Sequence, residues 1–470
     1  MTSSEQNSWQ STTTKPYVLS TTESVCPICL GRISAERIVR GNELYLAKSC
    51  PEHGRFESII RRGDLETVTV LPERVAAFPQ NPLTCVENGC PFDCGLCAEH
   101  RQQPCCVLLE LTQRCDLSCP VCYASAGCEN NSKSTSDPDL NTISNWYDLL
   151  LSAGGPFNIQ LSGGEPTMRD DLPEIITIGK QKGFTFFQLN TNGLRIARDK
   201  EYLVELKKAG LSTVYLQFDG TSDAILKKIR SHEILEQKKA AIKNCCDVNI
   251  GVVLVPTIIP GINDLDIGNI LRFALKYHPV VRGVHFQPVS YFGRYPEAPA
   301  DSDRITLPEI ITAMQAQTEG LIQTSWFTPS GGPNRYCSFN GNFVVMENGA
   351  LKPIISKQSQ SCCCSPQDAA KERVKAQGFV ARNWKAPETE DLSPVISTSF
   401  GGWDSFLARA KTHLFAVSGM AFQDAWTFDI ERVRDCYIMV VSPDNRLIPF
   451  CAYNLTDSSG NSMYRHNHDR

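Results

Sequence analysis

The middle of the chain alternates between short apolar runs and stretches with helical spacing. Six apolar runs are predicted to be buried strands: 106–112, 157–164, 184–193, 212–220, 248–257 and 281–290. Strands that alternate with helices pair in parallel through right-handed crossovers. Six such units are two short of a closed eight-fold barrel. The pattern therefore predicts an α/β fold, a partial, open (βα)6 TIM-like barrel, with its chemistry at the C-terminal ends of the strands.

The stretches between the strands carry helix signals. After the first strand, four apolar residues stand at i, i+3, i+4 and i+7: Ile143, Trp146, Tyr147 and Leu150. The next stretch has Asp170 and Asp171 at its amino end, Pro173 in its first turn and Gly183 at its end. A third places four apolar residues on one face: Ile267, Ile270, Leu271 and Ala274. Each pattern predicts a helix that packs on the sheet.

Charge and length narrow the class of protein. The 470 residues are enough for two or three domains. Lys plus Arg number 46 and Asp plus Glu number 51, which gives a net charge of −5. This charge does not indicate a cationic surface that would bind nucleic acid or anionic lipid. The apolar run 437–441 is far too short to span a membrane. No secretory signal is visible at the N-terminus, and residues 1–22 are predicted to be a disordered lead-in.

The 21 cysteines change the picture, because they are clustered. In a reducing compartment, clustered cysteines are more often metal ligands than disulfides. They gather before residue 130 and after residue 336, whereas the long middle holds only Cys245 and Cys246, which we expect to be core residues. We therefore predict a metal-binding N-terminal domain over 23–104, the barrel over 105–325 and a cysteine-containing C-terminal domain over 326–470.

Three cysteines follow directly on the first predicted strand: Cys115, Cys119 and Cys122. Three thiolates on a four-iron cluster leave one iron free to take a substrate or cofactor. At the end of the second strand stands "GGEP", Gly163 to Pro166. Its glycines let the backbone approach a ligand, and its edge can bind an ammonium group. The two motifs predict a site for a chelating amino acid whose sulfonium group can accept an electron and release a carbon radical.

These two motifs, in these two strands, closely resemble those of the radical S-adenosylmethionine superfamily over about residues 106–290. The resemblance implies that the three cysteines bind a [4Fe–4S] cluster and that Tyr123 lies near the adenine of S-adenosylmethionine. It assigns the methionine amine to Gly163, Gly164 and Glu165. Four further residues are implied at the ribose, the carboxylate or the substrate: Asn190, Asn192, Gln217 and Asp219. The alternative for these four is turn formation at strand ends.

A second cysteine group repeats the spacing of the first. Cys90, Cys94 and Cys97 have no apolar strand before them, and Cys85 supplies a fourth thiolate. Four ligands close a cluster, which makes this group an auxiliary, electron-relaying cluster. A zinc site is the alternative.

The N-terminal group combines Cys26 and Cys29 with Cys50 and His53. Cys-x2-Cys followed by Cys-x2-His is the spacing of a mononuclear zinc or rubredoxin-like iron site. The alternative is that His53 only caps a turn and Cys50 is buried.

The C-terminal cysteines allow a further cluster, whose candidate ligands are Cys337, Cys362, Cys364 and Cys451. Adjacent side chains in "CCC" (362–364) diverge, so all three cannot serve one cluster, and Cys436 is a further candidate. Buried free thiols are the alternative. The terminal "HNHD" is interpreted as a frayed tail.

Further motifs flank these two: "CPIC" with "CPEHG", "GCPFDCGLCAEH", "LVPT" at 254–257, "FQPVS" at 286–290 and "IPFCAYN" at 448–454. Together they resemble the superfamily branch that contains archaeal tetraether lipid synthases and enzymes that methylate a pterin precursor. This resemblance implies activation of an sp3 C–H bond for C–C bond formation, on lipid alkyl chains as our first hypothesis. C-methylation of a pterin-like heterocycle is the second. A non-catalytic iron–sulfur electron carrier is the third, but a carrier needs neither "GGEP" nor a three-ligand cluster.

These hypotheses carry expectations about partners and shape. We expect an external electron donor such as ferredoxin or flavodoxin, no nucleic acid and no transmembrane segment. The protein is expected in the cytoplasm, with transient contact with a membrane surface left open for a lipid substrate. An alkyl substrate predicts an elongated, apolar pocket, closed by the first 100 residues and the segment after about 330.

Overall fold

The computed structural model describes residues 15–63, 65, 74–127, 137–354, 367–387, 406 and 409–465. The chain begins with an antiparallel sheet in the order β1(Tyr17–Val25), β2(Arg32–Arg40), β3(Glu43–Cys50) and β4(Gly54–Arg62). Because β1 starts at Tyr17, the disordered lead-in predicted up to residue 22 is wrong for residues 17–22. The side chains of β1 are exposed or half-buried before Ser24, so the hydrophobic pattern of this strand gives little signal.

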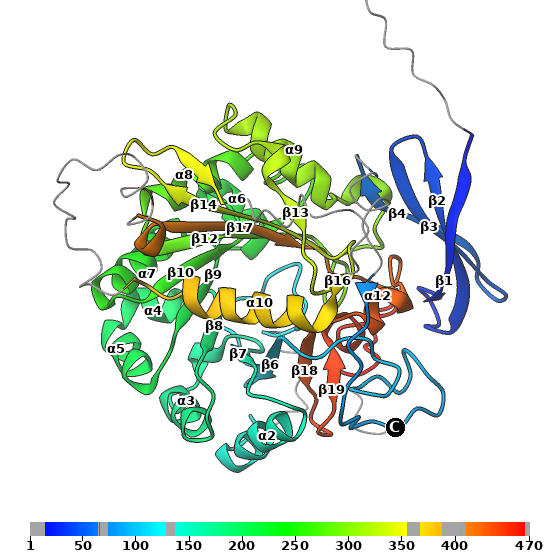
Figure 1. Ribbon diagram of the computed structural model, residues 1–470, viewed down its shortest axis with the longest axis horizontal. Helices are drawn as coiled ribbons and strands as arrows, with labels where there is room; N and C mark the ends of the chain where they lie inside the picture. The colour runs from blue at the N-terminus through cyan, green and yellow to red at the C-terminus, as the bar shows by residue number, and fades with distance from the viewer. Residues whose placement is uncertain are drawn as a thin grey trace, which may run out of the picture.

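All six predicted barrel strands are present and lie side by side in chain order, each parallel to the next (Figure 1). They are β6(Cys106–Glu110), β7(Asn158–Ser162), β8(Phe187–Thr191), β9(Thr213–Gln217), β10(Gly251–Val255) and β12(Val281–Pro288). Their apolar residues form the main core together with the helices that cover the outside of the sheet. The predicted α/β fold with a partial barrel is therefore confirmed.

Among the described residues, eight helices cover the sheet, and the two for which an apolar face was predicted, over 143–150 and 267–274, bury that face. They are α2(Leu140–Ser152), α3(Leu172–Gln181), α4(Leu194–Arg198), α5(Lys200–Ala209), α6(Asp223–Arg230), α7(Leu235–Val248), α8(Ile267–Lys276) and α9(Leu307–Gln317). In α2 the buried residues are Ile143, Trp146, Tyr147 and Leu150, as the spacing predicted. In α7 Cys245 is buried as expected, but Cys246 is exposed, because neighbouring helical residues point about 100° apart.

The C-terminal residues extend this sheet at both edges. Beyond β12, β17(Leu414–Met420) pairs in parallel and β14(Ser338–Val345) then pairs antiparallel. Beyond β6, β18(Ile438–Val441) pairs in parallel and β19(Leu447–Pro449) follows antiparallel. The domain boundary predicted at residue 325 stays a prediction, but segments on both sides of it share one sheet.

Helix α10(Ala369–Asn383) closes the N-terminal end of the barrel strands, and Figure 1 shows it crossing in front of them. Gln377 donates from Nε2 to the Pro156 carbonyl, 3.1 Å away, just before β7. Asn158 donates to the Gln377 carbonyl at 3.2 Å. The barrel therefore has a floor, made by a segment about 220 residues further along the chain.

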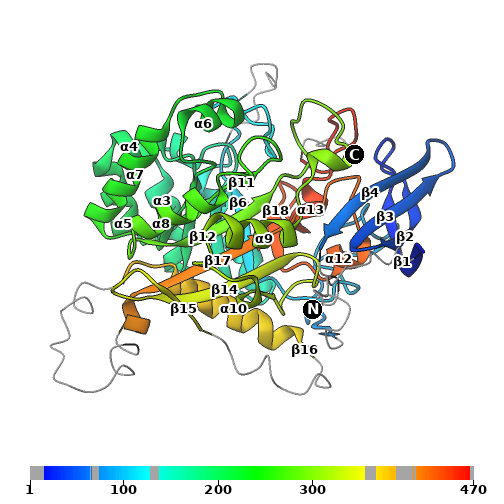
Figure 2. The same cartoon turned by 90° about the horizontal axis from the view of Figure 1, so that it is seen from above.

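The N-terminal sheet docks beside α12(Ile430–Arg434) at one side of the molecule (Figure 2). A buried ion pair joins Arg37 of β2 to Asp429 at 2.6 Å. Lys48 of β3 donates to the carbonyl of Ala425, also at 2.6 Å.

The remaining strands and helices are short: β5(Arg74–Val75), β11(Thr257–Ile258), β13(Thr328–Pro329), β15(Leu351–Pro353), β16(Gln367–Asp368), α13(Phe450–Tyr453) and the 3-10 turns η1(Pro166–Met168), η2(Asp301–Asp303) and η3(Thr324–Trp326). In the part of the chain that the structure describes, every helix is too short or too polar to cross a membrane.

Candidate active site

A cavity of about 320 Å³ runs down the inside of the barrel. Its upper rim contains the three-cysteine loop and the "GGEP" turn, and its floor contains residues of α10 and Trp384. Eight residues after position 370 line it: Ala376, Val380, Trp384, Met420, Phe422, Tyr437, Ile438 and Phe450. Among the described residues, none before Cys105 lines it. The C-terminal segment thus helps to enclose the cavity as predicted, whereas the N-terminal sheet is not part of its wall.

Cys115, Cys119 and Cys122 all line this cavity. Cys119 is buried, and the other two are partly buried. Burial raises the pKa of the Cys115 thiol to about 12. A buried thiol of this kind ionises when it binds a cation, so the three sulfurs suit a metal centre better than an isolated catalytic thiolate.

Arg294, which the sequence analysis did not name, holds the cysteine loop in place. Its backbone exchanges two hydrogen bonds with Cys122, each 2.9 Å long. Its guanidinium donates from Nε to the Cys119 carbonyl at 2.8 Å and from Nη2 to the Ala126 carbonyl at 3.0 Å. The loop is therefore fixed by a residue about 170 positions further along the chain.

The two glycines of "GGEP" are explained by packing against the cysteine loop. A Cβ on Gly163 would lie 2.4 Å from the Thr112 carbonyl oxygen, and Gly163 has a φ of +120°. A Cβ on Gly164 would lie 2.3 Å from the Arg114 carbonyl oxygen. The sequence analysis gave ligand approach as the reason for both glycines. The structure adds that their missing side chains let the two loops meet, while both residues also line the cavity.

Glu165 joins the second and third strand ends. Its Oε1 accepts from the Thr167 and Thr191 hydroxyls at 2.6 and 2.7 Å, and its Oε2 accepts from the Asn192 amide at 2.7 Å. Burial raises the pKa of Glu165, which is only 1% exposed. Its carboxylate lines the cavity and fixes the loop geometry at the same time.

Tyr123 and Asn190 line the cavity, as does Asn192. The Tyr123 hydroxyl lies 2.7 Å from the Ser162 hydroxyl, at the end of β7. Asn192 donates to Asp116 of the cysteine loop at 2.6 Å and accepts from the Leu194 amide at 2.9 Å. Asn192 therefore has the turn contacts of the alternative interpretation.

Asp219 does not line the cavity. It is fully buried and paired with Arg230 through bonds of 2.7 and 2.9 Å. The expectation that Asp219 faces the cofactor thus disagrees with the geometry, because its carboxylate is directed at the guanidinium. Arg230 and Gln217 are the residues of this group that line the cavity.

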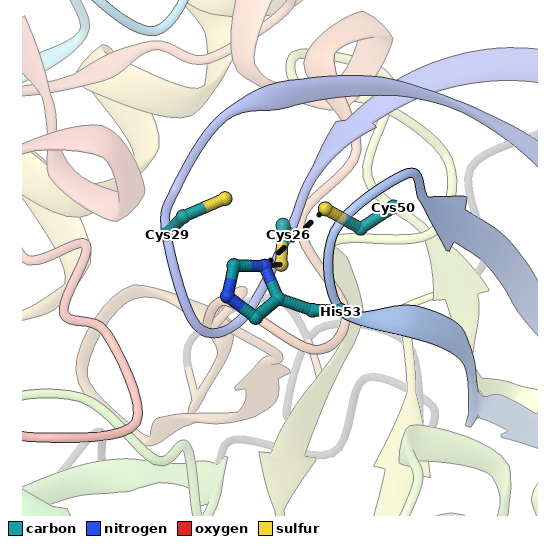
Figure 3. Close-up of side chains that lie close together, drawn as sticks. All are labelled: Cys26, Cys29, Cys50 and His53. Carbon is teal, nitrogen blue, oxygen red and sulfur yellow. Dashed lines mark hydrogen bonds between the residues drawn. The ribbon is translucent and has the colours of Figure 1, made fainter.

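The N-terminal metal-binding prediction fits the structure closely. The ligand atoms of Cys26, Cys29, Cys50 and His53 all lie within 4.8 Å of one another. Figure 3 shows them converging from two turns of the sheet, with His53 Nδ1 3.6 Å from Cys26 Sγ and 3.4 Å from Cys50 Sγ. Burial alone would raise the pKa of Cys50, but hydrogen bonds led by that from His53 lower it to about 7. Tetrahedral Cys3His coordination of one ion suits this arrangement.

The other two cysteine groups are less complete. Cys90, Cys94 and Cys97 are buried, whereas Cys85 is exposed. A hydrogen bond with Cys94 lowers the pKa of Cys90 to about 7. In the C-terminal group, Cys362, Cys364 and the rest of "CCC" lie outside the described residues, as does "HNHD".

Three members of the C-terminal group are described. The Cys436 thiol donates to the Ile438 carbonyl at 3.3 Å, and the other two accept hydrogen bonds at sulfur. Arg432 donates to Cys337 at 3.6 Å, and the Gln423 amide donates to Cys451 at 3.3 Å. Neither cysteine group is tested by these contacts, and both clusters stay predictions.

Sequence reasoning missed the polar wall deeper in the barrel. Its members point inward from the strands: Asn158, Gln160, Gln188, Tyr215, His285 and Gln287. A signal was present, because Asn158 and Gln160, like His285 and Gln287, stand two apart in otherwise apolar strands. Trp384 had no such signal, since only the crossing of α10 brings it to the cavity.

Comparisons with known proteins agree with this geometry. The model of the radical SAM superfamily matches residues 109–274, and the HMPTM N-terminal zinc ribbon domain matches residues 18–62. The chain is 36% identical to 7,8-dihydro-6-hydroxymethylpterin dimethyltransferase of Methanocaldococcus jannaschii, over 92% of this chain and 93% of that protein. It is 27% identical to a probable GTP 3',8-cyclase of the same organism, over 53% of this chain and 83% of that one.

Among solved structures, methylornithine synthase aligns with a TM-score of 0.37 at 16% identity, over 47% of this chain and 64% of that one. The superfamily implies a [4Fe–4S] cluster and S-adenosylmethionine as cofactors. The residues present fit both, because three thiols and the "GGEP" turn share one cavity that is open enough for a ligand. The chain belongs to the radical SAM superfamily, in the family of the pterin dimethyltransferase relative.

Proposed function

We propose that this protein is a radical SAM C-methyltransferase that acts on a pterin-like heterocycle. The observation that carries the proposal is the likeness to the pterin dimethyltransferase, which extends over 92% of the chain. The likeness therefore includes the N-terminal zinc ribbon (residues 18–62, called the ribbon below) and the C-terminal strands as well as the barrel. The cavity supports it independently. Carboxamide, hydroxyl and imidazole groups line the barrel below the cysteines, where an alkyl chain would leave part of their donors and acceptors unused.

This proposal replaces lipid coupling as the preferred hypothesis. The alkyl hypothesis predicted an elongated and predominantly apolar pocket. Most of the surface that lines the cavity is apolar, as that hypothesis predicted, so the choice between the two depends on the length of the cavity and on its polar groups. The cavity of about 320 Å³ is at the small end of the range for small-molecule sites, and it is closed below by α10. A compact ring fits that space and its hydrogen-bonding groups better than a long chain does.

The residues of the rim then have the following proposed roles. Cys115, Cys119 and Cys122 hold the cluster, which when bound supplies the electron that cleaves S-adenosylmethionine. Tyr123 packs beside the adenine, and Glu165 with its two preceding glycines receives the methionine amine. Gln217, which lines the cavity together with Arg230, is assigned to the ribose or the carboxylate and Asn190 to the substrate, because Asn192 and Asp219 are engaged elsewhere.

The metal groups outside the barrel have supporting roles in the proposal. We assign zinc to the N-terminal ribbon, given its four converged ligands and its match to a zinc ribbon model. The group of Cys85, Cys90, Cys94 and Cys97 is proposed as an auxiliary cluster. A small iron–sulfur or flavin protein, such as ferredoxin or flavodoxin, would supply the electrons.

Product analysis tests the proposed function. Anaerobically reconstituted protein is incubated with reductant, excess S-adenosylmethionine and 7,8-dihydro-6-hydroxymethylpterin. We expect pterin products heavier by one or two methylene units, together with 5′-deoxyadenosine. Parallel incubations with isoprenoid lipids should yield no coupled product. If coupled lipid forms and methylated pterin does not, the proposed function is wrong and lipid coupling becomes the preferred hypothesis.

A further inference from the structure

Three carboxamides form a connected chain in the lower half of the cavity. Gln188 donates to Asn190 at 2.8 Å, Asn190 donates to Gln160 at 3.2 Å, and Gln160 donates to the sulfur of Cys106 at 3.4 Å. A carboxamide has two N–H donors and an oxygen with two acceptor sites. Each of these side chains therefore keeps unused donors or acceptors, and all three line the cavity.

Aromatic rings form another part of this lower wall. Tyr215 of β9 stacks on Trp384, with ring centroids 5.4 Å apart and planes at 22°. The ring of His285 also lies against Tyr215, with ring centroids 5.6 Å apart and planes at 43°. Trp384 is 9% exposed, and among the residues that the structure describes its buried Nε1–H has no hydrogen-bond partner. An unpaired buried donor costs stability, so a ligand in this cavity that reached the Trp384 N–H would supply the acceptor it lacks.

The described lining carries no unengaged formal charge. Its one carboxylate, Glu165, accepts from Thr167, Thr191 and Asn192, as described above. Its one guanidinium, Arg230, is paired with the buried Asp219. Burial lowers the pKa of His285 to about 4, which keeps the imidazole neutral, and its Nδ1 lies 2.8 Å from the Ser418 hydroxyl.

We propose that this lower half of the cavity, between the amide chain and the Tyr215–Trp384 stack, is the substrate subsite, and that it selects an uncharged, planar nitrogen heterocycle over its phosphate ester. The inference rests on the proposed function and adds to it the residues and the charge state of the substrate. Free amide groups match the alternating donors and acceptors of a pyrimidinone-type edge. The indole N–H supplies a donor to a ring nitrogen or carbonyl, and the aromatic faces supply stacking.

The selection against phosphate follows from the same wall. A phosphate ester carries about two negative charges and is normally bound by arginine, lysine or a helix N-terminus. Within the described lining, the paired Arg230 is the only such group. Burying a phosphate there would leave its charge without a partner.

Equilibrium binding to the full-length, anaerobically reconstituted protein tests this inference without turnover. The probes are 6-hydroxymethylpterin, which is fluorescent, its phosphate ester, and the neutral rings lumazine and guanine. The variants are Trp384→Phe, which removes the N–H and keeps a ring, and Gln188→Leu. Trp326→Phe is the matched control, because Trp326 packs on Phe343 away from the cavity. Thermal unfolding checks that each variant is folded.

We expect the phosphate ester to bind at least about tenfold more weakly than the free pterin. Trp384→Phe and Gln188→Leu should each weaken binding of the free pterin about five- to tenfold, the usual effect of losing one buried hydrogen bond, whereas Trp326→Phe should not change it. Equal binding of ester and free ring, or wild-type affinity in both folded cavity variants, would overturn the inference.

Failure of the inference differs from failure of the proposed function. If the protein methylates pterin but neither Trp384→Phe nor Gln188→Leu weakens pterin binding, the subsite is wrong and the proposed function stands. Binding of lumazine or guanine that depends on Gln188 and Trp384, without any pterin methylation, would support the subsite and overturn the function. Binding of an isoprenoid alcohol with no binding of any ring would overturn both.

Discussion

The N-terminal ribbon and the rim of the barrel both gather cysteines, but they gather them differently. In the ribbon, four ligand atoms lie within 4.8 Å of one another and face a single point. At the rim, three thiols stand around a cavity that also exposes the "GGEP" turn. A closed set of four ligands suits a structural ion, and an open set of three suits a centre that must accept a further ligand.

The two sites also depend on different parts of the chain. The ribbon ligands come from two turns of one small sheet, and the first and last of them, Cys26 and His53, are 27 positions apart in the sequence. The rim depends on distant residues, because Arg294 holds the cysteine loop and Asn192 binds Asp116 within it. Local turns can build the ribbon site alone, whereas the rim requires the complete barrel.

The largest expected effect comes from removing the open set. Replacing Cys115, Cys119 and Cys122 together by Ala should abolish formation of 5′-deoxyadenosine, because no thiolate would remain to hold the cluster. The measurement is 5′-deoxyadenosine produced anaerobically with reductant. Cys245→Ala, a buried thiol in α7, is the control and should retain activity. Unchanged production by the triple variant would show that the reactive centre lies elsewhere.

Removing the closed set should affect folding more than chemistry. Structural zinc contributes on the order of 10 kcal/mol to small metal-dependent folds. In His53→Ala with Cys50→Ala, we expect loss of one metal ion per chain and loss of hydrogen-exchange protection in β1–β4. The barrel strands should keep their protection. Cys246→Ala, an exposed thiol, serves as control. Full protection of the ribbon without its ion would contradict a structural role for the metal.

The ion pair between the ribbon and the body should have a smaller effect. Arg37→Met leaves the buried Asp429 without its cation, which costs about 3 to 5 kcal/mol for pairs of this kind. Denaturant unfolding measures the loss. Arg55→Met on the same sheet is the control, because the Arg55 side chain is 63% exposed and its pair with Glu57 should contribute under about 1 kcal/mol. Equal losses in the two variants would argue against docking through Arg37.

The smallest expected effect is a pH dependence from the cavity wall. Burial lowers the pKa of His285 to about 4 from an ordinary value of 6.5. The unfolded chain therefore binds a proton near pH 6.5, while the folded chain does so only near pH 4. Stability from this group is complete above pH 6.5 and is lost as the pH falls toward 4.

In the His285→Phe variant, the part of the free energy of unfolding that the wild-type protein loses between pH 6.5 and 4 through His285 should not be lost. Denaturant unfolding between pH 4.5 and 8 compares the variant with the wild-type protein. Parallel pH curves for the two proteins would mean that folding does not lower the pKa of His285.

The sequence predicted the barrel strands because strands buried on both faces are continuous apolar runs. Helix α2 was equally predictable, since its four buried residues follow from their spacing in the sequence. The strands β17 and β18, which flank the six barrel strands, were not predicted as sheet neighbours, because local patterns do not specify a partner about 130 or 330 residues away.

The site was predictable to a similar extent. Motif spacing identified the rim cysteines and the ribbon ligands. The roles of Asp219 and Arg230 depended on side-chain direction, which spacing does not give. Trp384 entered the cavity only through tertiary packing of α10.

Hydrogen transfer between the two halves of the cavity tests the central claim most directly. The claim is that the cofactor at the rim and a ring held by the lower wall meet in one site. Anaerobic reactions use dihydropterin deuterated at its sp3 ring carbon and hydroxymethyl carbon, and mass spectrometry follows 5′-deoxyadenosine. The account predicts deuterium in 5′-deoxyadenosine from the wild-type protein and at least about fivefold less from Gln188→Leu at limiting pterin. Methylated pterin formed with no deuterium in 5′-deoxyadenosine would contradict it.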